Sequence, residues 1–433
     1  MKYAIIGGGI SGLSVANLLN GKNNVTVYEK ESQPGGLIKC RRVNGSLFHT
    51  CGGHVFNSKR QDVLDWFWSK FTREEEFSKA DRNSCVFMDK NGTSLEHDNI
   101  PYPIENHMYL FDEATQKAFY EDLEEIDNVK GVNANFTDYE SFGNFLRWRF
   151  GKTLYNLYFQ PYNEKVWRRD LTTIPMSWME GKLPMPTTRE MRENNANKVI
   201  EKVFVHSTFW YEQKDGSQYI ANKLAEGLNI NYDSEINSIE YKNGKWIVCG
   251  EEFDKVVFCG NIKDMVIMIK GVDVDAFKVP VEALEYHGTT SVFCEIDKNP
   301  YSWIYQPSRL HKSHRIICTG NFSQTNNGTT VPEGRITATI EFTDEISKED
   351  ILDNLSKIPL NPQYIDHQYN KYTYPIQDAN TRGMIKLLKD SLAPSGFFFT
   401  GRFADWEYYN MDVAIGAAMD LVNKLMSDEN TIY

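Results

Sequence analysis

The sequence predicts an α/β fold in which one nucleotide-binding domain is assembled from separate pieces of the chain. At the start, an apolar run over residues 2–6 meets a glycine-rich turn, a stretch with helical spacing and a second apolar strand over residues 25–28. Residues 275–375 are rich in strands, and a last apolar strand with a closing helix follows residue 396. A βαβ unit at one end, with a returning strand and helix at the other, predicts a discontinuous domain on a parallel sheet.

The turn after the first strand carries Gly7-x-Gly9-x-x-Gly12, and Glu29 closes the second strand. In a Rossmann unit the glycines allow a tight turn, close approach of the backbone to a pyrophosphate, and close packing of helix on strand. The helix start offers free N–H groups to the phosphates, and the acid can accept hydrogen bonds from a ribose. We therefore predict an adenine dinucleotide site, with a turn that binds nothing as the alternative. Its predicted cofactor-binding residues are Gly7, Gly9, Ile10, Ser11, Gly12, Glu29 and Lys30.

A second glycine pair follows at Gln33-Pro34-Gly35-Gly36. A second close approach of the backbone suits a permanently bound FAD better than a passing NAD, so we favour FAD. An ordinary Pro-Gly turn is the alternative. This segment adds Gly35, Gly36 and Leu37 to the predicted cofactor-binding residues.

Composition limits the classes of partner. The formal net charge of -12 argues against nucleic acid and against a general attraction to anionic membranes. The seven cysteines are scattered without a CxxC pair, which predicts reduced thiols in a cytoplasmic protein and no metal site. The chain starts with its first strand, which leaves no room for a signal peptide, and no apolar run approaches the ~20 residues of a membrane span.

We predict a discontinuous Rossmann-type FAD-binding domain of residues 1–78, 196–270 and 376–433. Residues 79–195 predict an inserted, mostly helical substrate domain, and residues 271–375 predict an antiparallel-sheet substrate domain.

Six further motifs occur in order along the chain. They are Gly52-Gly53-His54-Val55, Tyr102-Pro103-Ile104-Glu105-Asn106, the stretch from Pro161 to Trp167, Ser313-His314-Arg315 with Asn321-Phe322-Ser323, Tyr374-Pro375, and the stretch from Gly401 to Asp412. Any one is weak, but together they resemble the UDP-galactopyranose mutase family. These are FAD proteins related in fold to amine oxidases and protoporphyrinogen oxidase.

The resemblance assigns roles to particular residues. It implies substrate binding by Tyr102, Glu105, Asn106, Tyr162, Trp167, Lys182, Arg315, Tyr374 and Tyr408. It implies flavin contacts by Gly53, His54, Gly401, Arg402, Asn410, Met411 and Asp412. The residues expected to act in catalysis are His54, Lys182, Arg315, Tyr374 and Tyr408.

Several of these assignments have alternatives or depart from the family pattern. Trp167 could simply pack in the core, His54 could simply hydrogen-bond to backbone, and Arg315 alone would be taken as a surface arginine. Lys182 stands at or beside the family's second diphosphate arginine and lacks the planar fork of a guanidinium. Ile104, Glu105 and Asn410 also depart from the family's residues.

The resemblance implies a cytoplasmic, FAD-dependent isomerase of cell-surface polysaccharide biosynthesis. Such an enzyme interconverts the pyranose and furanose forms of a UDP-sugar through a reduced-flavin N5 adduct, without net redox change. The partners are then the UDP-sugar and an external reductant, and an oligomer is possible. One alternative is an FAD-dependent oxidase or desaturase of the amine oxidase or protoporphyrinogen oxidase type, and another is a flavin-binding protein without catalysis. The sequence leaves open which nucleotide sugar is bound and which partner reduces the flavin.

Overall fold

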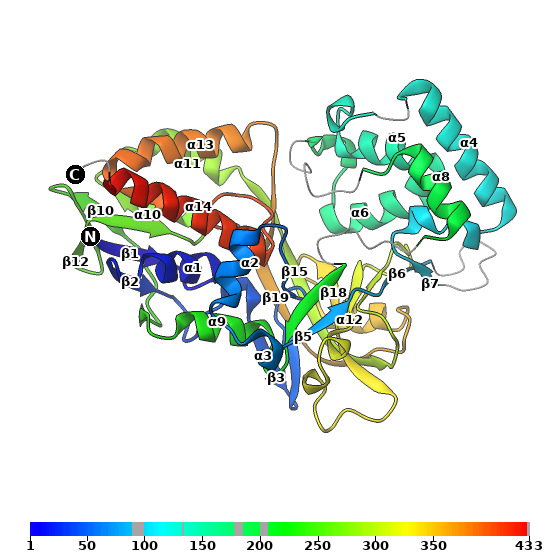
Figure 1. Cartoon of the computed structure of the whole chain (residues 1–433), viewed down its shortest axis with the longest axis horizontal. Helices are drawn as coiled ribbons and strands as arrows, with labels where there is room; N and C mark the ends of the chain where they lie inside the picture. Colours follow the sequence, from blue (N-terminus) through cyan, green and yellow to red (C-terminus); the bar gives the residue numbers. More distant parts are fainter. Residues whose placement is uncertain (89–98, 132–133, 177–184, 200–206, 431–433) are drawn as a thin grey trace.

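A computed structural model describes residues 1–88, 99–131, 134–176, 185–199 and 207–430. Figure 1 places the two ends of the chain in one lobe, at the left, and the helices of residues 113–197 in a separate group at the upper right. The strands labelled β15, β18 and β19 lie between and below these two groups.

The left lobe is built on a five-stranded parallel sheet in the order β20-β13-β1-β2-β9. Its strands are β1 (Lys2–Ile6), β2 (Asn24–Tyr28), β9 (Asn229–Asn231), β13 (Lys255–Phe258) and β20 (Phe397–Phe399). After Lys2 the central β1 is apolar and buried, as a strand covered on both faces should be. Strands from three distant parts of the chain share this sheet, which confirms the predicted discontinuous Rossmann-type fold.

Helices cover this sheet on both sides. The helices α1 (Ile10–Leu19) and α14 (Met411–Asn430) pack against each other, although one follows the first strand and the other closes the chain. The other helices of this lobe are α2 (Gln61–Trp68), α3 (Arg73–Glu76), α9 (Ser217–Ala225), α10 (Ile262–Met268), α11 (Asp275–Glu282) and α13 (Thr381–Leu392). A small sheet of β10 (Ile239–Lys242), β11 (Lys245–Val248), β12 (Glu251–Phe253) and β14 (Ile269–Lys270) completes it.

A seven-stranded sheet runs in the order β19-β15-β18-β17-β16-β6-β7. Its strands are β6 (Ser84–Phe87), β7 (Asn99–Pro101), β15 (Glu285–Asp297), β16 (Trp303–Tyr305), β17 (Arg315–Ile317), β18 (Arg335–Thr343) and β19 (Gln363–Ile376), with α12 (Lys348–Leu355) between the last two. Every neighbouring pair is antiparallel except β16 and β6.

The assignment of β6 and β7 to the helical insertion was wrong. They extend the seven-stranded sheet, because β6 pairs with a strand more than two hundred residues later, at Ile304 opposite Cys85. A local pattern of residue types carries no information on such a distant partner. The other boundaries of the three predicted domains stay a prediction.

The helical insertion packs around its own aromatic core. It contains α4 (Glu113–Val129), α5 (Phe142–Leu154), a π-helical turn (Tyr155–Phe159), α6 (Gln160–Trp167) and α8 (Thr188–Asn197). Phe119, Phe142, Phe145 and Phe150 are almost fully buried there. The π turn leads directly into α6, which brings Tyr162 and Trp167 toward the sheet.

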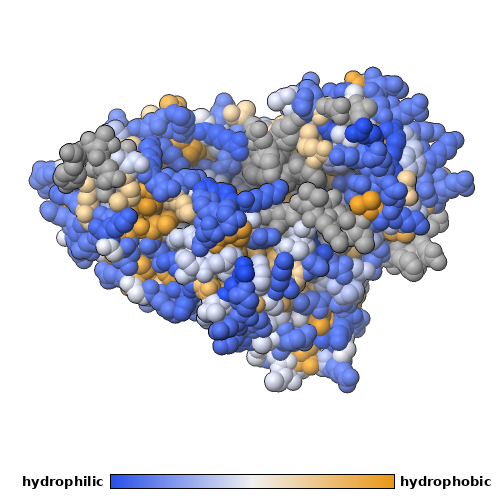
Figure 2. All heavy atoms as spheres, in the orientation of Figure 1, coloured by the Kyte–Doolittle hydropathy of each residue, from blue (hydrophilic) through white to orange (hydrophobic). Residues whose placement is uncertain are grey.

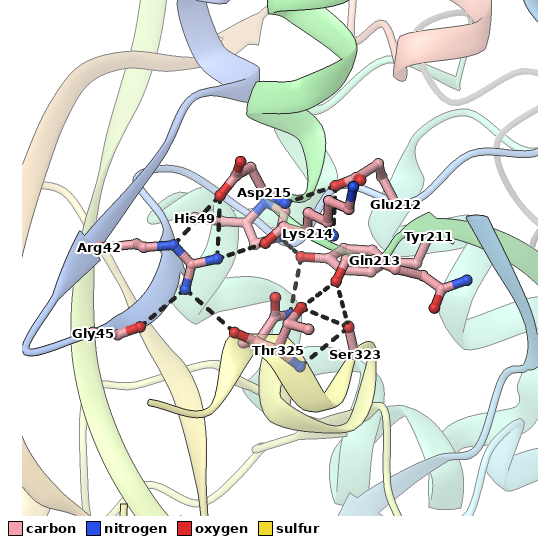
Figure 3. Close-up of polar contacts among 11 residues, drawn as sticks. Arg42, Gly45, His49, Tyr211, Glu212, Gln213, Lys214, Asp215, Ser323 and Thr325 are labelled. Atoms are coloured by element: carbon pink, nitrogen blue, oxygen red, sulfur yellow. Dashed lines mark hydrogen bonds and ion pairs between the residues drawn. The ribbon is translucent and has the colours of Figure 1, made fainter. Parts of the chain in front are cut away.

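A polar network joins the Rossmann lobe to the seven-stranded sheet (Figure 3). It spans the hairpin of β3 (Cys40–Val43) and β4 (Ser46–His49) and the end of β8 (Thr208–Glu212), which pairs with β5 (Phe77–Asp81). Arg42 Nη2 donates to Asp215 Oδ1 at 3.1 Å, and Ser323 Oγ donates to the Gln213 carbonyl at 3.1 Å. Arg42 Nη1 also donates to the Thr325 carbonyl at 3.3 Å, which links the hairpin directly to the turn between β17 and β18.

The face of the molecule in Figure 2 is mostly hydrophilic, with hydrophobic residues in small separate patches. Within the described ranges, no helix combines the length and apolar character needed to cross a membrane.

Candidate cofactor and substrate cavities

The larger of two adjoining cavities, the first cavity, has a volume of about 490 Å³. It opens beyond the carboxyl ends of β1, β2 and β13, where open α/β sheets bind their ligands. Fourteen of the predicted cofactor-binding residues line it: Gly7, Gly9, Ile10, Ser11, Glu29, Lys30, Gly35, Gly36, Leu37, Gly53, His54, Arg402, Asn410 and Met411. Segments far apart in sequence thus meet around one space.

Gly7, Gly9 and Gly12 differ in backbone conformation and in the space around them. Gly7 has φ +108°, a conformation that favours glycine, and its N–H donates to the Tyr28 carbonyl at 2.8 Å. A Cβ on Gly12 would lie 1.9 Å from the Gly7 carbonyl oxygen, so this position is closed to any side chain. A Cβ on Gly9 would meet only the Gly36 Cα, at 3.9 Å. A side chain at position 9 would therefore project into open space, which we call the cradle, and glycine leaves this space empty.

Glu29 is held rigidly at the end of β2. Its Oε2 accepts the Gly8 N–H at 2.6 Å, and its Oε1 accepts the Glu31 N–H at 3.0 Å. The side chain is buried but lines the first cavity. Since each carboxylate oxygen has two lone pairs, both can still accept a hydrogen bond from a ribose hydroxyl.

His54 is neutral in its loop. Its Nε2 lies 3.0 Å from the Leu37 carbonyl oxygen, which can only accept, so Nε2 is the donor. Burial and the nearby Arg402 guanidinium lower the pKa of His54 to about 4. The backbone hydrogen bond that was the simpler expectation for this residue is present, and the ring also lines the first cavity.

Arg402 and the start of α14 form the far wall of the first cavity. Arg402 Nη1 donates to the Tyr409 carbonyl at 3.2 Å, and its buried Nε has no hydrogen-bond partner in the part of the chain that the structure describes. Asn410 and Met411 line the cavity at the helix start, where free N–H groups favour anions. Gly12, Gly401 and Asp412 lie behind the lining, and the Asp412 carboxyl instead hydrogen-bonds to Ser58.

The second cavity, of about 290 Å³, lies between the helical insertion and the seven-stranded sheet. The predicted substrate residues that line it are Tyr102, Glu105, Tyr162, Trp167, Arg315, Tyr374 and Tyr408. Four residues line both cavities: Tyr305, Arg315, Tyr374 and Tyr408. A ligand in the second cavity would therefore touch the residues that also face a ligand in the first.

Aromatic rings and a cation order this junction. Tyr374 and Tyr408 stack with their ring centroids 5.5 Å apart, and the Arg402 guanidinium lies 4.2 Å from the Tyr408 centroid. Trp167 meets Tyr374 edge to face at 5.9 Å, and it is 7% exposed. Trp167 belongs to the core cluster of the insertion and also lines the second cavity. The residue therefore both packs in the core and faces the cavity.

Arg315 is anchored by a buried acid. Its Nε donates to Glu341 Oε2 at 2.6 Å, its Nη2 also contacts that oxygen, and Nη2 lies 3.4 Å from the Tyr374 hydroxyl. Burial alone would raise the pKa of Glu341, but the Arg315 guanidinium lowers it to about 2. The expectation of a surface arginine does not describe this side chain, which is largely buried at the junction of the cavities.

Among the predicted substrate residues that the structure describes, Asn106 lies in neither lining. Asn106 is buried, and its side chain accepts a hydrogen bond from Asn194 at 3.2 Å. Lys182 lies outside the described residues.

Sequence reasoning missed Tyr305, Glu341 and the lining role of His314. Glu341 did leave a signal, since an acid between Ile340 and Phe342 in an apolar strand requires a buried partner. Tyr305 left none, because nothing in its short strand distinguishes a lining tyrosine from a core one.

The fold and the two cavities define the class of protein: a Rossmann-like dinucleotide-binding fold with a second, adjoining cavity. A family model described as an NAD(P)-binding Rossmann-like domain matches residues 5–71. The chain is 20% identical to a Mycoplasma pneumoniae protein named UDP-galactopyranose mutase, over 98% of this chain and 96% of that protein. A Mycoplasma genitalium protein of the same name is 21% identical over 98% of this chain and 94% of its own length.

Solved structures agree on the fold. A crystal structure of reduced UDP-galactopyranose mutase matches with a TM-score of 0.84 and 20% identity, over 98% of this chain and 94% of that one. A putative protoporphyrinogen oxidase from Exiguobacterium matches with a TM-score of 0.74 and 13% identity, over 99% of both chains. The predicted resemblance to the UDP-galactopyranose mutase family is confirmed by these relatives over 98% of the chain.

Proposed function

We propose that this protein is a UDP-galactopyranose mutase-like isomerase that holds FAD in the first cavity and a UDP-sugar in the second. The observation that carries the proposal is the sharing of Tyr305, Arg315, Tyr374 and Tyr408 by both cavities. That junction would bring the sugar of one ligand against the reactive ring of the other. Effective reaction between two bound groups depends on such fixed proximity.

The residues of the first cavity fit a flavin dinucleotide. Gly9 leaves room for a pyrophosphate, and Glu29 offers acceptors to a ribose. The buried Nε of Arg402, which has no hydrogen-bond partner among the described residues, could donate to the cofactor. When bound and reduced, the flavin would supply a nucleophilic nitrogen for the anomeric carbon of the sugar.

The chain's own residues would bind and orient the substrate. Arg315 offers a guanidinium, fixed by Glu341, to the oxygens of a diphosphate, and it remains charged at every physiological pH. The hydroxyls of Tyr374 and Tyr408 can donate to the same oxygens. Leaving-group charge that grows on the diphosphate as its bond to the sugar breaks would be stabilised by these preorganised donors.

The aromatic walls would hold the rest of the substrate. Tyr162 and Trp167 present ring faces or edges to the second cavity, which suits stacking on a base or covering a sugar. With a ligand bound, the same walls would exclude water from the junction, and this would strengthen each electrostatic contact inside it.

A second candidate is an FAD-dependent oxidase or desaturase. The apolar part of the second cavity favours it, since Phe142, Leu146, Phe150 and Val166 could face an apolar substrate. A buried arginine fixed at the cavity junction is harder to reconcile with such a ligand than with a diphosphate.

A conversion assay tests the proposal. Flavin-loaded protein is incubated with UDP-galactofuranose, with and without dithionite, and the products are separated by chromatography. We expect UDP-galactopyranose to form only with the reduced protein. Oxygen-dependent turnover of an amine that is unaffected by UDP, without sugar conversion, would instead support the oxidase.

A further inference from the structure

His314 stands immediately before β17 and next to Arg315, but the two side chains occupy different places. Arg315 lines both cavities, whereas His314 lines only the second. The residue is 1% exposed, and its backbone is fixed on both sides. Its N–H donates to the Glu341 carbonyl at 3.1 Å, and its carbonyl accepts the Gln306 N–H at 3.0 Å. The imidazole therefore sits on a rigid stretch of chain at the cavity wall.

Both ring nitrogens of His314 are buried, and neither has a hydrogen-bond partner within the described ranges. Glu341 Oε2 lies 3.6 Å from Nε2, which is longer than a hydrogen bond. Buried polar atoms without partners are uncommon and cost free energy. An unpartnered ring that lines a cavity points to a polar ligand group in that cavity.

Burial favours the neutral form of this ring. Burial lowers the pKa of His314, and Arg315 and Lys165 nearby add to this effect, although Glu341 opposes it. A neutral imidazole offers one donor and one acceptor. Lys165 does not compete for the same ligand group, because its Nζ donates to the Gln306 and Ser313 carbonyls at 2.9 and 2.8 Å.

Because His314 lines only the second cavity, it would contact the part of the ligand that lies away from the junction. If the proposed function is right, the sugar must lie at the junction, among the four residues shared by both cavities. The nucleotide then extends into the part of the second cavity that is lined by residues absent from the first. His314 is one of those residues, with Tyr162, whose ring centroid lies 6.5 Å from that of His314.

We propose that His314 is a binding and specificity residue that hydrogen-bonds to the nucleoside diphosphate end of the UDP-sugar. This inference rests on the proposed function. It adds a neutral donor and acceptor pair beside the charge of Arg315, so that the site would recognise more than the negative charge of its ligand.

The test is calorimetric titration of UDP and of UDP-galactose into the reduced, flavin-loaded protein. For His314→Phe we expect the Kd of both ligands to rise about tenfold, the loss of one or two hydrogen bonds in a buried site. His314→Asn keeps a donor and an acceptor and should stay closer to the unchanged protein. Flavin content, read from its absorbance, should not change in either variant.

His311 provides the matched control. It is also buried, both its ring nitrogens also have no partner among the described residues, and it lines neither cavity. His311→Phe should leave both Kd values unchanged.

The outcomes are distinct. Equal UDP affinity of His314→Phe and the unchanged protein would overturn the inference while leaving the proposed function intact. A loss confined to UDP-galactose would also overturn it, since the contact would then lie at the sugar. Failure of the unchanged protein to bind UDP would overturn both. If His314→Phe does not fold, the same comparison is made with His314→Asn and His314→Ala.

Discussion

Arg315 and Glu341 lie directly opposite each other on the antiparallel strands β17 and β18, and Arg315 Nε donates to Glu341 Oε2 at 2.6 Å. Glu341 is 1% exposed, so its charge depends on this partner. The pair places one fixed positive group where the two cavities meet. Cross-strand pairing, rather than a loop, therefore sets the position of the guanidinium.

Removing the charge of the acid should destabilise the fold. In Glu341→Gln the shape is kept but Arg315 is left as a buried cation without its counterion, so we expect a loss of roughly 1–3 kcal/mol in the free energy of unfolding. Urea denaturation of the two proteins measures it. Glu295→Gln is the control, since its 3.8 Å contact with Arg335 lies away from the cavities and should contribute less than about 1 kcal/mol. Equal losses in the two variants would contradict the role assigned to Glu341.

Removing the guanidinium should separate substrate binding from cofactor binding. In Arg315→Ala we expect kcat/KM for the UDP-sugar to fall at least about a hundredfold, because the diphosphate loses its charged donor. Flavin absorbance should be retained. Arg315→Lys restores the charge without the fork and should recover only part of the activity. Loss of the flavin from Arg315→Ala would show that this side chain serves the first cavity instead.

Two alanine substitutions in the glycine turn should fail in different ways. Gly9→Ala has free space for its Cβ in the protein itself, so it should fold but lose flavin, because the methyl group occupies the pyrophosphate cradle. Gly12→Ala would place its Cβ 1.9 Å from the Gly7 carbonyl oxygen and should prevent α1 from packing on β1. Circular dichroism measures folding, and absorbance measures flavin. A Gly9→Ala protein that retains full flavin content would contradict this account of the cradle.

The sequence predicts the Rossmann unit well because Gly7, Gly9 and Gly12 act within one short segment. Their jobs depend on neighbours a few residues away, so spacing is enough. The junction is different, because Arg315, Tyr305 and Tyr374 come from separate strands whose pairing partners are distant in sequence. The resemblance to a family supplied Arg315 and Tyr374. Glu341 left a signal as an acid between apolar residues, but the identity of its partner, like the lining role of Tyr305, became visible only once the sheet order was known.

Acid should weaken the fold through buried histidines. Burial lowers the pKa of His49 to about 3, with the nearby His54 adding to the effect, and its Nε2 lies 2.9 Å from the Tyr211 hydroxyl. An unfolded histidine takes up its proton near pH 6.5, so the unfolded state binds more protons than the native state between about pH 6.5 and 3. The contribution of His49 to the free energy of unfolding is therefore fully present above pH 6.5, and it is lost as the pH falls from 6.5 toward 3. One such group contributes about 2 kcal/mol between pH 7.5 and 5.

Unfolding in urea at pH 7.5 and pH 5 measures this loss. His49→Gln cannot titrate, so its stability should change less between the two values than that of the unchanged protein, whatever its stability at pH 7.5. An identical pH dependence in both proteins would rule out His49 as a source of acid sensitivity.

The central claim is that cofactor and UDP-sugar occupy adjoining cavities that meet at Arg315, Tyr374 and Tyr408. A crystal structure of the reduced, flavin-loaded protein with UDP-galactose tests it most directly. We predict the flavin in the first cavity, the nucleotide in the second, and the diphosphate against Arg315. UDP-galactose bound elsewhere, with Arg315 still engaged only by the protein, would contradict the claim.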